Sequence, residues 1–220
     1  MRLRLPEERP KEPPTGYKIA HPVLSQEGGR AGFLGISIGS GLPYGVLDNA
    51  RCAYGRRHRS PSRFCDCGFH CLHERCEAQA LLCAAEYRKA VLLEVVVLGA
   101  YIRFELGMRY ARQRVRAATV GPCACRRTAT GLADAGWGRP GWQVLEPVCG
   151  ACAGGRTPLS LADFARRGGE GLRVVASPEA EVESAVTAAE LVAEAALLQA
   201  RLDWFQGQLA KLTGGEHGKG

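Results

Sequence analysis

The chain has few aromatic side chains, few lysines and no apolar run long enough to cross a membrane. Aromatic residues make up 7% of its 220 residues, and 24 of the 29 basic residues are arginine. The longest apolar stretch, residues 90–102, contains Glu94 and is shorter than the roughly 20 residues that a spanning helix needs. The opening residues are charged and rich in proline, which argues against a secretory signal. We therefore expect a cytoplasmic protein without membrane contact.

Ten cysteines are the most informative feature that is present. In a reducing compartment disulfides are disfavoured, and cysteines clustered with histidines more often bind metal. The cleaner of two clusters consists of two close pairs separated by 23 residues: Cys123 with Cys125, and Cys149 with Cys152. Zinc prefers four soft donors in a tetrahedron, and each pair supplies two thiolates. Residues 121–155 resemble a zinc ribbon, with free buried cysteines as the alternative.

The other cluster lies in an irregular segment rich in arginine, glycine and serine, which cannot pack a core alone. Its favoured ligands are Cys52, His58, Cys65 and Cys67. Competing donors follow closely: His70, Cys71, His73 and Cys76. A later histidine in place of His58, or no metal, are the alternatives. A catalytic thiol is disfavoured because no isolated cysteine–histidine pair stands apart from the cluster.

The hydrophobic pattern predicts an α+β fold with a small curved or split sheet. Residues 90–99 read as a buried central strand, residues 108–120 as a strand or a helix, and residues 71–89 as a helix. A short helix is expected after an N-cap at Thr157 or Ser160. The expected units are a disordered leader (1–15), a body with a metal-ordered Cys/His loop (16–120), a zinc-ribbon-like module (121–177), a long amphipathic helix (178–213) and a tail (214–220).

The last predicted helix carries a heptad seam. Ser177 is its expected N-cap, and Pro178 occupies the first turn. The seam alternates four and three residues through Leu191, Ala195, Leu198, Leu202, Phe205, Leu209 and Leu212. Docking onto the chain's own body and self-association as a coiled coil are both open.

Residues 16–118 show a resemblance to known families. The Gly68–His70 step enters a predicted helix that leads to an apolar strand, which is similar to the second half of the ADP-ribosyltransferase core. The opening Gly16-Tyr17 and the turn from Cys65 to Phe69 also resemble uncharacterised actinobacterial and phage proteins. The transferase resemblance implies a split, curved sheet with a cleft between its halves.

The same resemblance implies roles for individual residues. His70 stands where the family has a ring-stacking tyrosine, and Tyr17 or His21 stands near the first-strand position. The family's glutamate would lie on the strand near residues 110–114, where this chain offers Gln113 and no carboxylate. A shared fold with lost chemistry is therefore expected.

The basic charge is concentrated in the body. The net charge is +7, and because residues 178–220 carry −4, the rest of the chain carries +11. On a strand, Arg112, Arg114 and Arg116 project together about 6–7 Å apart and could follow a phosphate backbone. An ordinary solvated arginine face is the alternative, because few aromatic residues are available for base stacking.

These features favour a non-catalytic, zinc-stabilised binding module that holds two zinc ions. Its partner is expected to be nucleic acid or protein, reached through the basic body and the helix at residues 178–213. One alternative is a divergent ADP-ribosyltransferase-like enzyme with a degenerate active site. Another is an assembly subunit that oligomerises through that helix.

Overall fold

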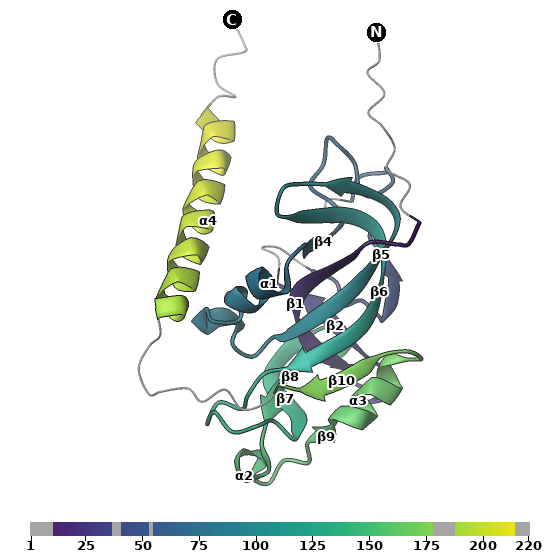
Figure 1. The fold of residues 1–220 in the computed structure, drawn as a ribbon, viewed down its shortest axis with the longest axis vertical. Helices are drawn as coiled ribbons and strands as arrows, with labels where there is room; N and C mark the ends of the chain where they lie inside the picture. Colours follow the sequence, from purple (N-terminus) through teal and green to yellow (C-terminus); the bar gives the residue numbers. More distant parts are fainter. Residues whose placement is uncertain (1–10, 37–40, 53–54, 178–187, 214–220) are drawn as a thin grey trace, which may run out of the picture.

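The computed structural model describes residues 11–36, 41–52, 55–177 and 188–213 (Figure 1). Within these ranges the chain forms one mostly antiparallel ten-stranded sheet with helices around it. The strands are β1 (Thr15–Ser25), β2 (Ala31–Gly35), β3 (Leu47–Asn49), β4 (Phe69–Leu72), β5 (Val91–Arg103), β6 (Gly107–Val120), β7 (Gly131–Arg139), β8 (Trp142–Val148), β9 (Leu159–Ser160) and β10 (Arg173–Ala176). The helices are α1 (Arg75–Leu81), the 3-10 helix η1 (Ala85–Tyr87), α2 (Gly150–Ala153), α3 (Leu161–Gly168) and α4 (Ala188–Thr213).

The β5–β6 hairpin forms the centre of the sheet. The two strands pair from Val91 with Val120 to Arg103 with Met108, with irregularities after Glu94 and Leu98. Their apolar, largely β-branched sequences suit a pleated strand that is buried on one or both faces. The predicted central strand is confirmed, as is the strand interpretation of residues 108–120.

Strand β1 organises the rest of the sheet. One edge of β1 pairs with β5 and then with β8, and the opposite edge pairs with β4 at Tyr17 and with β2 from Ala20 onward. No described strand pairs with that second edge at Lys18 and Ile19, between the ends of β4 and β2. The sheet is therefore split at these two residues.

Strand β4 closes a ring of strands, because it pairs with both β1 and β6. Cys71 of β4 lies between two glycines, Gly16 on β1 and Gly107 on β6. A Cβ atom on Gly16 would overlap the Cys71 sulfur, and one on Gly107 would overlap the Cys71 carbonyl oxygen. The two glycines thus permit the close approach that lets β1, β5, β6 and β4 surround one core.

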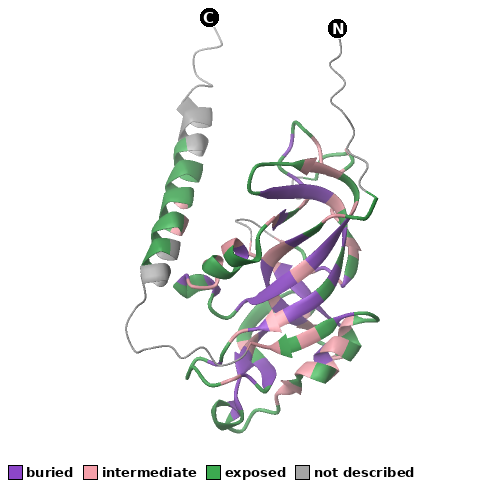
Figure 2. Cartoon of the chain, viewed as in Figure 1, coloured by how far each residue is buried: buried purple, intermediate pink, exposed green. Residues whose placement is uncertain are grey.

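The main core fills this ring (Figure 2). Leu93, Val95 and Val115 are fully buried inside it together with Tyr110. Phe164 of α3 is 1% exposed and packs edge-to-face on Phe33 of β2, with ring centroids 5.8 Å apart. Burial of a large apolar side chain of this kind contributes about 2–3 kcal/mol to folding.

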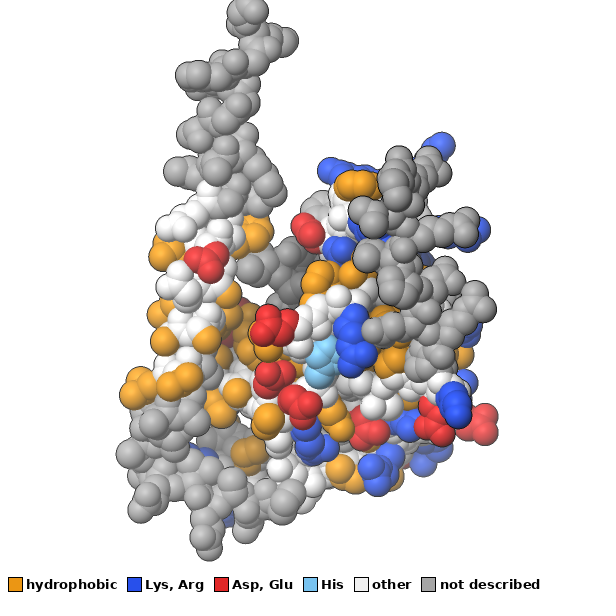
Figure 3. All heavy atoms as spheres, turned by 45° about the horizontal axis from the view of Figure 1, so that its top comes forward, with side chains coloured by type: hydrophobic (Ala, Val, Ile, Leu, Met, Phe, Trp, Pro, Cys, Tyr) orange, Lys and Arg blue, Asp and Glu red, His pale blue; other side chains and the backbone are white. Residues whose placement is uncertain are grey.

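Helix α1 covers part of the outer face of the ring, and α4 lies beside it. Leu197 of α4 packs against the small cluster under α1, and Arg201 forms an ion pair with Glu86. Other apolar side chains of α4 remain open: Leu198 is 57% exposed and Phe205 is 61% exposed. Figure 3 shows apolar side chains along the exposed surface of this helix.

The predicted α+β class is wrong, because the protein is mostly β. The expected helix at residues 71–89 is reduced to α1 and η1, since Cys71 and Leu72 belong to β4. The hairpin β7–β8, expected within a separate ribbon, continues the body's sheet, because Val144 of β8 pairs with Val23 of β1.

Two predictions concern the ends of helices. Ser160 is the N-cap of α3, and its hydroxyl accepts a hydrogen bond from the Asp163 backbone N–H. Three expected parts lie wholly or partly outside the described residues: residues 178–187 of the last helix, residues 1–10 of the leader (1–15) and the tail (214–220). The described end of the leader reaches Thr15, which already belongs to β1. Among the described helices, none is both long and apolar enough to cross a bilayer.

Candidate metal centres and an adjoining cleft

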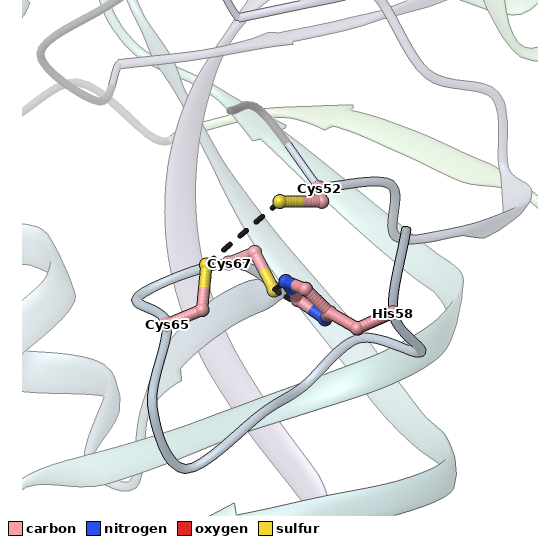
Figure 4. A group of neighbouring side chains, drawn as sticks. All are labelled: Cys52, His58, Cys65 and Cys67. Atoms are coloured by element: carbon pink, nitrogen blue, oxygen red, sulfur yellow. Dashed lines mark hydrogen bonds between the residues drawn. The ribbon is translucent and has the colours of Figure 1, made fainter. Parts of the chain in front are cut away.

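The first candidate centre lies in the irregular segment between β3 and β4. Figure 4 shows the side chains of Cys52, His58, Cys65 and Cys67 converging on one point. Their candidate ligand atoms all lie within 4.8 Å of one another. The sulfurs of Cys52 and Cys65 are 3.8 Å apart, and the Cys67 sulfur is 3.8 Å from both His58 ring nitrogens. Zinc–sulfur bonds of about 2.3 Å in a tetrahedron place two sulfurs about 3.8 Å apart, so the spacing fits a bound metal.

Arg109 of β6 anchors this loop to the sheet. Its guanidinium is buried and donates hydrogen bonds to two loop carbonyl oxygens, that of Cys65 at 2.5 Å and that of Ser62 at 3.0 Å. The Ser60 hydroxyl donates to the Cys67 sulfur at 3.1 Å. A donated hydrogen bond stabilises a thiolate ligand and fixes its orientation. The loop is therefore held by the sheet on one side and by the four ligand side chains on the other.

The four competing donors are placed elsewhere. Cys71 points into the core and is 5% exposed. His73 Nε2 lies 3.0 Å from the carbonyl oxygen of Phe104, and Cys76 is exposed on α1. His70 lines a cleft that is described below. The structure thus brings together the favoured set of ligands and not the alternatives.

The second candidate centre joins the end of β6 to α2. Cys123 and Cys125 lie in the turn after β6, Cys149 is the N-cap of α2, and Cys152 lies within α2. Their ligand atoms also lie within 4.8 Å of one another, and the sulfurs of Cys125 and Cys149 are 3.4 Å apart. The turn requires Arg126 to adopt a positive φ of 69°. All four predicted ligands are therefore brought to one place.

Backbone N–H groups favour the thiolate form in this second group. Hydrogen bonds from the Cys152 backbone and from the Cys125 side chain lower the pKa of Cys149 to about 6. Desolvation raises the pKa of Cys123, but backbone hydrogen bonds from Cys125 and Cys149 outweigh it and the pKa is lowered. Side-chain hydrogen bonds with the other three cysteines raise the pKa of Cys152 to about 12. Thiolates are the form that binds metal, so the group is partly prepared for an ion.

Both groups could hold a metal ion, and the chemistry of the donors restricts which kind. None of the ten cysteines is in a disulfide, and sulfurs 3.4–3.8 Å apart are too far for the disulfide bond length of about 2.05 Å. One group offers three sulfurs and a nitrogen, and the other offers four sulfurs. Four protein donors fill a tetrahedron and leave no position for substrate. The arrangement suits a structural metal rather than a catalytic one.

The predicted arginine stripe is present on β6. Arg112, Arg114 and Arg116 are exposed, and they alternate with buried Gln113 and Val115. No described carboxylate forms an ion pair with any of the three arginines. Their guanidinium groups are therefore available to an external anion.

A cleft of about 1050 Å³ opens where the sheet is split. Two of the three positions suggested by the transferase resemblance line it, through Tyr17 and His70, whereas His21, the alternative to Tyr17, is not among the lining residues. The third, Gln113, is fully buried in the core, where its Oε1 accepts a hydrogen bond from the Tyr110 hydroxyl at 2.9 Å. Desolvation and the positive charges of Lys18 and Arg109 lower the pKa of His70, which favours its neutral form at pH 7.

Lys18 is the cleft residue that the sequence did not reveal. In the sequence, Lys18 looks like an ordinary exposed lysine on a strand whose polar and apolar residues alternate. Its neighbours in the structure, Tyr44 and Phe69, come from distant segments of the chain. The one available signal is its register: Lys18 pairs with Leu93, which faces the core. Comparison of the chain with protein-family models, with curated proteins and with solved structures finds no match, so its function is interpreted from its own geometry.

Proposed function

We propose that this protein is a zinc-stabilised binding protein whose two metal centres are structural. The observation that carries the proposal is the presence of two closed four-donor groups, each with thiolate or imidazole ligands at tetrahedral spacing. Zinc is the metal that this soft donor set prefers. The first centre orders an arginine-rich loop, and the second ties the end of β6 to the end of β8 through α2.

We further propose that the basic surface beside the first centre binds the phosphate backbone of nucleic acid. The loop begins directly next to the stripe, because Asn49 of β3 pairs with Arg112 and the Ala50 N–H donates to the Ala111 carbonyl oxygen at 2.6 Å. Further exposed arginines, Arg51 and Arg57 among them, follow in the loop. A row of unpaired arginines on a rigid strand supports contact with a regular series of phosphates.

Fluorescence anisotropy with labelled RNA and DNA of mixed sequence tests the nucleic-acid proposal. Three phosphate contacts predict that affinity falls about 20- to 40-fold when salt rises fourfold. Replacing Arg112 and Arg114 by serine should reduce the slope of log affinity against log salt by about 2. As a charge-matched control, the Arg127→Ser, Arg166→Ser double variant should bind like the native chain. No binding at low salt, or equal loss in both double variants, contradicts the proposal.

The transferase-like alternative has less support. The cleft does bring Tyr17 and His70 together, but Asp48 is the one carboxylate among the described residues that line it. Both Asp48 oxygens already accept hydrogen bonds, from the N–H groups of Gly45 and Asn49. No free carboxylate is available to stabilise a positive charge on a substrate. We therefore propose that the cleft binds a ligand without turning it over.

Assembly through α4 is a second candidate function with an observation of its own. The helix meets the body through Leu197 and Arg201, whereas the seam residues Leu198, Leu202 and Phe205 are exposed. A seam with heptad spacing fits another helix with the same spacing, so we propose a second copy of α4 as its partner. Light scattering should show a larger mass for the full chain than for one ending at residue 177. Equal monomeric masses would remove this candidate.

A further inference from the structure

The cleft lies where no described strand pairs with one edge of β1, between the ends of β4 and β2. Strands β4 and β2 occupy that edge on either side of Lys18 and Ile19, and the side chains around the opening come from several segments. Its volume of about 1050 Å³ lies just above the range for small-molecule sites, about 300–1000 Å³. The opening is therefore large enough for an organic ligand.

Lys18 is placed at this opening without a counter-ion. Its ammonium lies 4.8 Å from the ring centroid of Tyr44 and 5.0 Å from that of Phe69, and the two rings meet edge-to-face. No described carboxylate forms an ion pair with it. Burial lowers the pKa of Lys18 to about 8, which shows that the charged form is poorly solvated. Two aromatic faces stabilise an ammonium only in part, so the site lacks an anion.

The remaining wall of the cleft is basic and apolar. Arg51 and Arg139 line it, and Asp48, the one acid among the described lining residues, already accepts two hydrogen bonds. Tyr17 and Trp142 supply flat aromatic surface, and Leu42, which is 68% exposed, supplies apolar surface. A ligand that complements this wall carries negative charge at one end and a planar apolar body at the other.

We propose that the cleft is a binding site for a small organic anion with a planar ring, whose carboxylate, sulfonate or phosphate pairs with the Lys18 ammonium. The anion supplies the missing counter-ion, and the ring packs against the aromatic and apolar wall. Two arginines at the cleft draw the anion toward the lysine. This site does not include the arginine stripe on β6, although Arg51 borders both surfaces, and it does not depend on nucleic-acid binding.

Isothermal titration calorimetry with three probes separates the two parts of the proposal. The probe 2-naphthoate carries both ring and charge, 2-naphthylmethanol carries the ring alone, and inorganic phosphate carries the charge alone. We expect 2-naphthoate to bind about 10- to 100-fold more tightly than either of the others. Binding of the alcohol or of phosphate with the affinity of 2-naphthoate would overturn the proposal, as would no binding of 2-naphthoate.

Variants locate the binding at Lys18. Lys18→Met should weaken 2-naphthoate about 10- to 100-fold, whereas Lys11→Met, which removes the same charge from an exposed site outside the cleft, should leave the affinity unchanged. Arg139→Gln, at an exposed position where folding is not at risk, should weaken it about two- to fivefold. Equal affinity of Lys18→Met and Lys11→Met, with Arg139→Gln unchanged, would overturn the proposal.

Discussion

The Arg109 guanidinium donates a hydrogen bond of 2.5 Å to the Cys65 carbonyl oxygen and so joins the central sheet to the first metal loop. It also donates to the Ser62 carbonyl oxygen and lies 3.6 Å from the Asp66 carboxylate. Truncation of the Arg109 side chain would leave the carbonyl groups of Cys65 and Ser62 without these donors and would remove the positive charge beside the loop. The loop of the first candidate centre is therefore anchored by a residue outside its four candidate ligands.

Arg109→Met should destabilise the protein by about 2–4 kcal/mol and weaken the metal at the first centre, because the loop loses its attachment to β6. Urea unfolding measures the first effect, and competition with a chromophoric zinc chelator measures the second. Arg112→Met, three residues along the same strand on an exposed position, is the control and should change neither. Native metal retention in Arg109→Met would show that the four ligands hold the loop alone.

Replacing Cys125 and Cys152 by serine should remove the second metal and spare the first. Both residues are exposed, so the substitutions leave the hydrophobic core intact, but two of four ligands are lost. Hydrogen exchange of the α2 amides should become faster, because the folding free energy supplied by metal at this site is gone. Cys76→Ser, at another exposed cysteine, should keep both metals. Slow α2 exchange in the double variant would mean that α2 does not need a metal.

The pKa of Lys18 gives a stability prediction with a definite sign. Its pKa falls from 10.5 to about 8 on folding. Between these pH values Lys18 is therefore mostly protonated in the unfolded chain and mostly deprotonated in the native chain. The contribution of Lys18 thus makes the native state less stable as pH falls from about 10.5 to 8, and the penalty is constant below pH 8. Lys18→Met should therefore stabilise the protein at pH 7 by about 1–3 kcal/mol, while it weakens the binding of the anion.

The gain from Lys18→Met should shrink above pH 8 and vanish near pH 10.5. Three neighbouring groups do not produce the same change in stability over this pH range. Desolvation lowers the pKa of His70 from 6.5, so it titrates at lower pH. Desolvation raises the pKa of Cys71 to about 11 and raises that of Tyr44, so both change stability in the opposite direction. Urea unfolding of both proteins across this pH range measures the difference, in which titrations common to the two chains largely cancel. A difference that does not vary with pH would contradict the assigned environment of Lys18.

Local patterns in the sequence predicted which cysteines and which histidine lie together in the two candidate centres. Cys65 with Cys67 and Cys149 with Cys152 are close in the chain, so each pair needs only a turn to converge. The apolar run of β5 was equally clear. The alternating arginines of β6 suited the period of a strand but left a helix open, and the structure shows the strand. These features depend on a few neighbouring residues.

The sheet and the cleft could not be predicted in the same way. Cys71 falls at the start of the predicted helix, yet its pairing with Met108 of β6 places it in a strand. Val144 joins Val23 across most of the chain, which makes the expected ribbon hairpin part of the main sheet. Lys18 acquires its unusual environment from Tyr44 and Phe69, which no local pattern connects to it. Long-range pairing decided each of these outcomes.

The central claim is that eight residues hold two metal ions, and native mass spectrometry with elemental analysis tests it most directly. The account predicts two zinc ions per chain and, after chelation and unfolding, ten thiols that react with a thiol reagent. A chain purified under reducing conditions with zinc present that contains no metal, or whose cysteines are paired as disulfides, would contradict it.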